Sequence, residues 1–203
     1  DLALYITHFL RQEKEVVGNF VEFFGESLDS LSVADRSTIS NMAPEYGAQL
    51  SYFPIDEKTY QYLNDTNRSE KIHLAKQYFE SQCLSYNPST IPNYSIHLTL
   101  DLNKVSTIIA GPNRPEIKQS LESLPEAFAN YCINQQGIDE DEIQHHGKIA
   151  LASITSCTNT SNPQLMIAAG LVAKKANELG LTVPSFTKTS FTPGSKVVTK
   201  YLD

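Results

Sequence analysis

Apolar and polar residues alternate most strictly at residues 94–102, where an apolar side chain occupies every second position. This period predicts a strand with one buried face. A run rich in valine and phenylalanine, closed by a glycine, predicts a further strand within residues 15–25. Apolar residues at helical spacing predict helices at residues 2–10, 56–63, 69–84 and 124–133. The first part of the chain is therefore expected to mix helices and strands.

Local sequence signals mark the start and the end of one more helix in this part of the chain. Ser32, followed three residues later by Asp35, resembles a capping box in which Asp replaces the usual Glu. The helix should end near Pro44, because a proline ring clashes with the preceding turn. Asn41 and Glu45 therefore fall in a helix end and the turn after it. Judged by residue type alone, Glu45 is a surface turn residue.

The last quarter has the most regular pattern. It predicts a strand at residues 148–155, a polar loop at 156–162, a helix from Pro163 to Gly180, a strand at 182–191 and a tight turn into a last helix. This order predicts parallel strands joined by right-handed crossovers. The turn-forming run at residues 111–115 is the best linker candidate. We expect an α/β protein with mainly parallel sheets flanked by helices, in two units, 1–115 and 116–203.

Composition and charge narrow the classes of function. The 203 residues carry 23 acidic and 16 basic side chains, for a net charge of −7. This balance argues against a dedicated nucleic-acid binder, which clusters Lys and Arg. No apolar run approaches the roughly 18 residues that a membrane span requires. Three widely spaced cysteines are too few for a disulfide framework, which favours a reducing compartment such as the cytoplasm.

Candidate chemistry centres on Cys157, which lies in the polar loop between a predicted strand and a predicted helix N-terminus. Unpaired N–H groups at such a place favour a thiolate, either as a nucleophile or as a metal ligand. The alternative is a small buried core residue. Cys83 and Cys132 share helix faces with apolar residues and are expected to pack in the core. The adjacent histidines at 145 and 146 are expected to be solvated or to play a supporting role.

Five motifs, taken in order, resemble segments of the aconitase family, closest to its branch of bacterial aconitate hydratase A and iron-regulatory proteins. The resemblance covers nearly the whole chain and is weakest at residues 116–146. Its motifs are VVGNFVEFFG (16–25), ADRSTISNMAPEYGA (34–48), GPNRP (111–115), SCTNTSNP (156–163) and TPGSK (192–196).

The resemblance implies two α/β units similar to domains 2 and 3 of the family, within an internal fragment of a longer enzyme. It implies a [4Fe–4S] cluster held by three cysteines, of which Cys157 is the first and the others follow residue 203. It places Asn41 and Glu45 in the active site. A fragment with one of three cluster ligands is expected to be inactive by itself.

The implied enzyme is a monomeric cytoplasmic hydro-lyase that isomerises citrate and isocitrate through cis-aconitate. Two functional alternatives stay open at this point. One is a relative that acts on 2-methyl-cis-aconitate or methylcitrate. The other is a regulator that binds mRNA when it lacks the cluster. A small α/β domain without a cluster is the remaining possibility.

Overall fold

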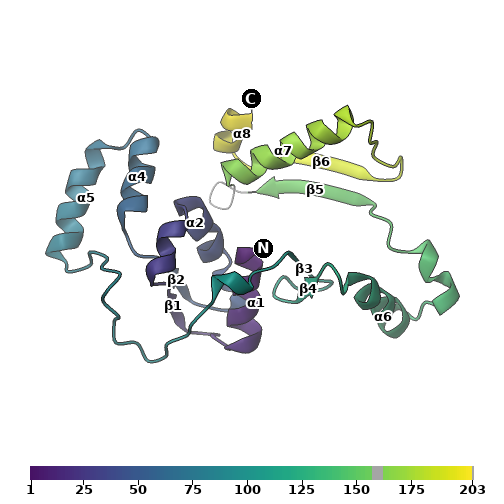
Figure 1. The fold of residues 1–203 in the computed structure, drawn as a ribbon, viewed down its shortest axis with the longest axis horizontal. Helices are drawn as coiled ribbons and strands as arrows, with labels where there is room; N and C mark the ends of the chain where they lie inside the picture. Colours follow the sequence, from purple (N-terminus) through teal and green to yellow (C-terminus); the bar gives the residue numbers. More distant parts are fainter. Residues whose placement is uncertain (157–161, 203) are drawn as a thin grey trace. The chain divides into compact units, whose positions relative to one another are not determined.

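The computed structural model describes residues 1–156 and 162–202, and their contacts divide the chain into two units, Asp1–Val105 and Ser106–Asp203 (Figure 1). Short sheets in both units are flanked by helices, so the predicted α/β class is confirmed. The predicted division after residue 115 stays a prediction. No helix in the described ranges is long and apolar enough to cross a membrane.

The first unit consists of helices around one short parallel sheet. Strand β1 (Phe20–Glu22) pairs with β2 (Leu50–Tyr52), with Phe20 opposite Leu50. The predicted strand within residues 15–25 is thus only three residues long. The helices are α1 (Leu2–His8), a π-helical turn η1 (Phe9–Glu13), a 3-10 turn η2 (Glu26–Ser30), α2 (Val33–Asn41), α3 (Ala43–Tyr46), α4 (Glu57–Asp65), α5 (Glu70–Ser81) and a 3-10 turn η3 (Leu102–Lys104).

The core of this unit lies between α1, α2 and the turn that leads into β2. Its largest fully buried side chains include Tyr46 and Ile39. Burial of such apolar surface is the main driving force that holds these helices together. The buried cluster comprises Ile6, Phe9, Leu10, Val16, Ile39, Tyr46 and Ala48.

The predicted capping box at the start of α2 is confirmed. Asp35 N donates to Ser32 Oγ at 3.2 Å, and Ser32 N donates to Asp35 Oδ2 at 3.0 Å. Two otherwise unpaired N–H groups of the first turn are thereby satisfied. Helix α2 ends at Asn41, and Pro44 lies in the first turn of α3, where a missing N–H costs nothing.

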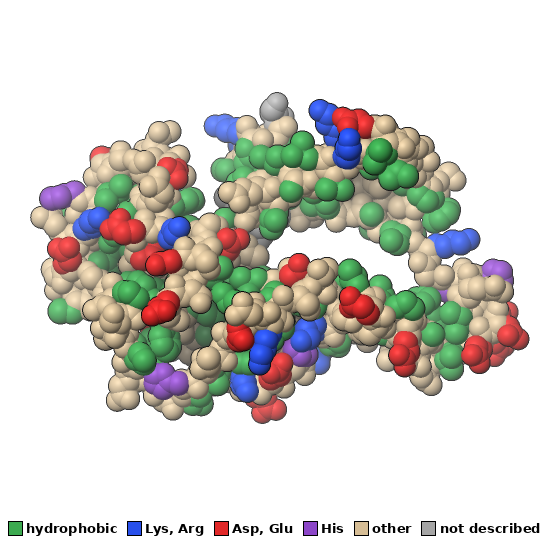
Figure 2. All heavy atoms as spheres, viewed as in Figure 1, with side chains coloured by type: hydrophobic (Ala, Val, Ile, Leu, Met, Phe, Trp, Pro, Cys, Tyr) green, Lys and Arg blue, Asp and Glu red, His purple; other side chains and the backbone are tan. Residues whose placement is uncertain are grey.

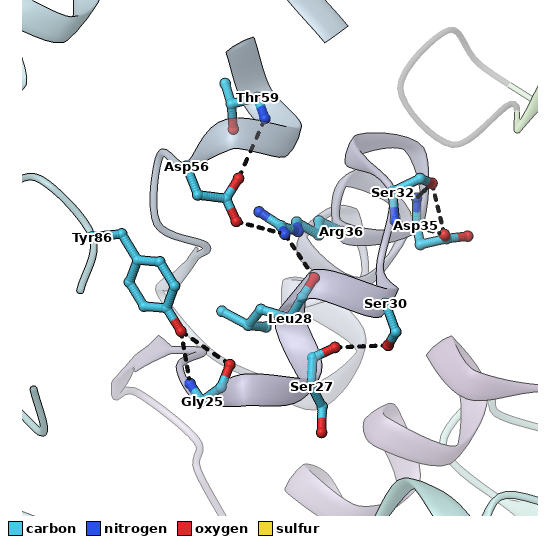
Figure 3. A network of polar contacts seen from close by, with 10 residues as sticks. All are labelled: Gly25, Ser27, Leu28, Ser30, Ser32, Asp35, Arg36, Asp56, Thr59 and Tyr86. Carbon is cyan, nitrogen blue, oxygen red and sulfur yellow. Dashed lines mark hydrogen bonds and ion pairs between the residues drawn. The ribbon is translucent and has the colours of Figure 1, made fainter. Parts of the chain in front are cut away.

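Arg36 is a buried cation that joins three elements of the first unit (Figure 3). From α2, its Nη2 donates to Leu28 O of η2 at 2.7 Å and to Asp56 Oδ2 at 2.8 Å. Asp56 caps α4 and accepts from Thr59 N with its other oxygen. These partners compensate part of the cost of burying the charge, since Arg36 Nε and Nη1 have no hydrogen-bond partner among the described residues.

A second contact in the same view anchors the chain that follows α5, the second helix of the α4–α5 hairpin (Figure 3). The Tyr86 hydroxyl donates to Gly25 O at 3.0 Å and lies 3.2 Å from Gly25 N, which donates to it. The hairpin is thus anchored on both sides, before α4 by Asp56 and after α5 by Tyr86.

Two predictions for the first unit are wrong. Residues 94–102 form no strand with any part of the chain that the structure describes; only the short turn η3 forms at their end. A strand needs a partner for its backbone groups, and alternation alone does not supply one. Cys83 is exposed with φ of 55°, because α5 ends at Ser81 before the cysteine can join its apolar face.

The second unit is built from a β-hairpin, a helix and a parallel βαβα segment. Strand β5 pairs with β6 in parallel, with Leu151 opposite Lys188, which confirms the predicted parallel strands. Strands β3 and β4 are antiparallel. The elements are β3 (Ile108–Ala110), β4 (Lys118–Ser120), α6 (Leu124–Gln136), a 3-10 turn η4 (Glu140–His145), β5 (Leu151–Ser156), α7 (Pro163–Glu178), β6 (Lys188–Pro193) and α8 (Lys196–Leu202).

Helix α7 has the ends that the sequence predicts. Pro163 occupies its first turn, and Gly180 follows its last residues with φ of 76°. Gly180 N donates to Asn177 O at 2.9 Å and Leu181 N donates to Ala176 O at 3.0 Å, the pair of bonds of a Schellman motif. Much of this helix is exposed, including Leu165, Leu171 and Val172. Figure 2 shows hydrophobic side chains where Figure 1 draws α7.

Candidate functional site

Asn41 and Glu45 lie on either side of the break between α2 and α3. The break is at Met42, which has φ of −87° and ψ of 11°. Glu45 N and Tyr46 N both donate to Met42 O, at 3.0 and 3.2 Å. The carbonyl at the break therefore starts the short helix that carries Glu45, and it keeps this helix close to the end of α2.

Tyr46 stabilises the break between α2 and α3 from within the core of the first unit. Its side chain is fully buried, and its Oη donates to Ile39 O in the last turn of α2 at 3.2 Å. Burial raises the pKa of Tyr46, a hydrogen bond with the Ser51 hydroxyl lowers it, and the Glu45 charge raises it again. The net shift is upward, so the phenol stays neutral and able to donate this bond to a higher pH than an ordinary tyrosine.

Gly47 ends α3 in a conformation that favours glycine. Its φ is 82°, and a Cβ built on it would lie 2.5 Å from Arg11 Nη1 and 3.1 Å from Val17 Cγ2. Gly47 O also accepts from Gly18 N at 2.8 Å. The turn after Glu45 is thus packed against the loop before β1, and a side chain at residue 47 would be strained by the positive φ and would crowd Val17.

Glu45 carries a buried carboxylate oxygen without a donor. The side chain is only partly exposed, and no hydrogen-bond partner for its Oε2 exists among the described residues. Asn41, at the end of α2, is exposed. A buried acceptor without a donor is costly and uncommon, so this oxygen is suited to accept a bond from a group outside the described chain.

Cys157, the third predicted site residue, lies outside the described residues. Its described flanks are the last residue of β5, at 156, and Asn162, whose Oδ1 caps α7 by accepting from Gln164 N at 3.1 Å. Cys157 therefore follows a strand end and precedes a helix N-terminus in sequence, the position at which open parallel sheets bind ligands.

The other candidate ligands are not brought together. No group of three His, Cys, Asp or Glu side chains within residues 1–156 and 162–202 could hold a metal ion. Cys132 is buried in α6, as predicted, and Cys83 is exposed in the other unit. His145 and His146 are exposed. Iron–sulfur clusters are held by several thiolates, and the two described cysteines lie in different units, so Cys157 stays a predicted ligand.

Sequence reasoning missed Tyr46 as the support of the site. It appears in the chain as one polar aromatic residue beside a glutamate, and neither its spacing nor its type distinguishes it from an exposed tyrosine. Only the contact with Ile39 O shows its role.

The comparisons with known proteins agree over the whole chain. The model of the aconitase family (aconitate hydratase) matches residues 1–203. Proteins named aconitate hydratase A are similar to this chain over its full length: 46% identical in Francisella tularensis subsp. holarctica, 47% in Rickettsia bellii and 45% in Bacillus subtilis. The chain spans 24% of the length of each of these relatives. On this evidence the chain belongs to the aconitase family.

Proposed function

We propose that this chain is part of an aconitate hydratase, a hydro-lyase that isomerises citrate and isocitrate through cis-aconitate. The observation that carries the proposal is the buried Glu45 Oε2 without a donor, four residues from the exposed Asn41. The names of the relatives support the same activity.

Glu45 and Asn41 have complementary roles in this proposal. Glu45 Oε2 accepts a hydrogen bond from a substrate hydroxyl or a water molecule and exchanges a proton with it. The Asn41 amide has both donors and an acceptor, and it orients a carboxylate or hydroxyl of the tricarboxylate. The short helix α3, fixed by Tyr46 and Gly47, keeps the carboxylate aligned without further reorganisation.

Cys157 holds a [4Fe–4S] cluster in this proposal, together with thiolates from outside these 203 residues. When bound, the cluster supplies a Lewis acid that helps a hydroxyl group to leave and return. The exposed thiol of Cys83 fits a reducing compartment, so we place the protein in the cytoplasm.

Two variants of the full-length protein test the residue assignments. Glu45→Gln should lower turnover by roughly 10²-fold or more, because the amide cannot exchange a proton. Glu70→Gln, at an exposed position in α5, is the matched control. Unchanged turnover in Glu45→Gln would return Glu45 to the role of a surface turn residue.

Cys157→Ser should abolish the iron–sulfur absorbance and reduce the bound iron of the purified protein, with Cys83→Ser as the control. Normal absorbance and iron content in Cys157→Ser would show that the ligand assignment is wrong.

Assays with citrate and with methylcitrate separate the two substrate alternatives. The mRNA-binding alternative and the monomeric state stay predictions, and the net charge of −7 counts against the former.

A further inference from the structure

Residues 94–102 have the sequence of a strand and no strand partner in the described chain. Apolar side chains alternate over the whole segment, from Tyr94 to Leu102. The two-stranded sheet of the same unit, β1–β2, does not include it. The pattern and the observed conformation of this segment therefore disagree.

The backbone of the segment has unused hydrogen-bonding capacity. Within the described part of the chain, no backbone hydrogen bond joins residues 95–100 to any other residue. The nearest hydrogen bonds lie at its ends, where Tyr94 N donates to Pro92 O and Asp101 Oδ1 accepts from Asn103 N. Between them, the His97 ring lies 6.0 Å from that of Phe24 and 5.4 Å from that of Tyr94, centroid to centroid. Six consecutive residues thus present unpaired N–H and C=O groups, as the edge strand of a sheet does.

The apolar side chains of the segment are only partly used. Leu100 packs against the core of the first unit, and Tyr94 contacts Phe24 with ring centroids 5.4 Å apart. Ile96, between them, is 70% exposed, and Leu98 is 38% exposed. All four border an open groove of about 660 Å³ that runs between the segment, β1 and η2. The segment therefore lies along the unit without being buried by it.

We propose that residues 95–100 are a strand that pairs with an extended segment elsewhere in the full-length protein, outside these 203 residues. The partner has apolar side chains at alternate positions, which cover Ile96 and Leu98. Main-chain pairing of this kind supplies affinity, and the alternate side chains supply register.

Two facts indicate that the partner strand comes from the same protein and not from a second copy. This chain spans 24% of its relatives' length, so most of such a protein is available to provide the partner. A second copy would carry the same net charge of −7 over its whole chain, and this like charge opposes self-association.

Hydrogen exchange of the full-length protein tests this pairing. Alternate amides within residues 95–100 should exchange about 10²-fold or more slowly than those of the preceding loop, residues 87–92. Exchange at the rate of that loop would overturn the proposal. Protection that rises with protein concentration would also overturn it, because it would identify a second copy as the partner.

A matched pair of isoleucines sharpens the test. Ile91 and Ile96 are 69% and 70% exposed here, but only Ile96 belongs to the alternating run. In the full-length protein, Ile96→Ser should speed exchange of the protected amides at least roughly tenfold, because it removes buried apolar surface from the pairing. Ile91→Ser should leave those amides unchanged. Equal effects of the two substitutions would contradict the assigned partner face.

Discussion

Two polar side chains of α2 and α3 bind main-chain carbonyls in the interior of the first unit. Arg36 donates to Leu28 O and Tyr46 donates to Ile39 O. Both bonds place a long side chain across a junction between elements, so each residue determines how two helical segments meet. The predicted helix end at Asn41 is confirmed, whereas Glu45, expected in a turn, lies in the short helix α3. Neither contact was predictable, because burial of a polar side chain depends on the tertiary fold.

Tyr46→Phe should lower the free energy of unfolding of the full-length protein by about 1 kcal/mol, the typical net value of one hydrogen bond. Urea unfolding at neutral pH measures this change. Tyr62→Phe is the control, since Tyr62 is 44% exposed and should tolerate the change. A Tyr46→Phe variant as stable as the parent would mean that the bond to Ile39 O does not stabilise the break.

Among the elements, the helix ends that depend on neighbouring residues were predicted correctly from the sequence. The capping box of α2 and both ends of α7 follow from a few neighbouring residues, and the structure has them. The strand predicted at residues 94–102 failed because its backbone bonds depend on a distant partner. Cys83 was misplaced for a related reason: the apolar spacing continues past Ser81, but the helix does not.

The two glycines of α7 should respond to alanine in opposite directions. Gly170 lies inside the helix with open space around its Cβ position, so Gly170→Ala should stabilise by about 0.5–1 kcal/mol. Gly180 has φ of 76°, so Gly180→Ala should destabilise by about 1 kcal/mol. Denaturant midpoints of the two variants measure both effects, and a shift in the same direction for both would contradict the end assigned to α7.

At the scale of the whole molecule, the parallel pairing of β5 and β6 was predictable, because right-handed crossovers leave few topologies for a βαβ order. The division into units depends on packing, which a linear pattern does not describe. Titration also involves many residues at once, because several buried or half-buried tyrosines respond together to alkaline pH. Burial is the largest cause that raises the pKa of Tyr46, Tyr52, Tyr60 and Tyr94.

The raised pKa values of these tyrosines predict that the folded protein loses stability at alkaline pH. Above the ordinary tyrosine pKa of about 10, the unfolded chain loses phenolic protons that the folded chain keeps, so stability falls as pH rises toward the folded pKa. Below the ordinary tyrosine pKa, ionisation of these tyrosines does not change the stability. The stability difference between the parent and Tyr46→Phe should therefore shrink above about pH 10, as measured by urea unfolding at stepped pH. A constant difference would contradict the raised pKa of Tyr46.

The two anchors of the α4–α5 hairpin have a consequence for how such a protein changes in length. Asp56 binds Arg36 just before α4, and Tyr86 binds Gly25 just after α5, so the chain leaves and re-enters the unit at two fixed points. Residues added at the tip between them, near Asn67, lengthen only an exposed excursion, and the entropy cost of a longer loop rises slowly. The hairpin is thus a natural place for insertions that leave Asn41 and Glu45 undisturbed.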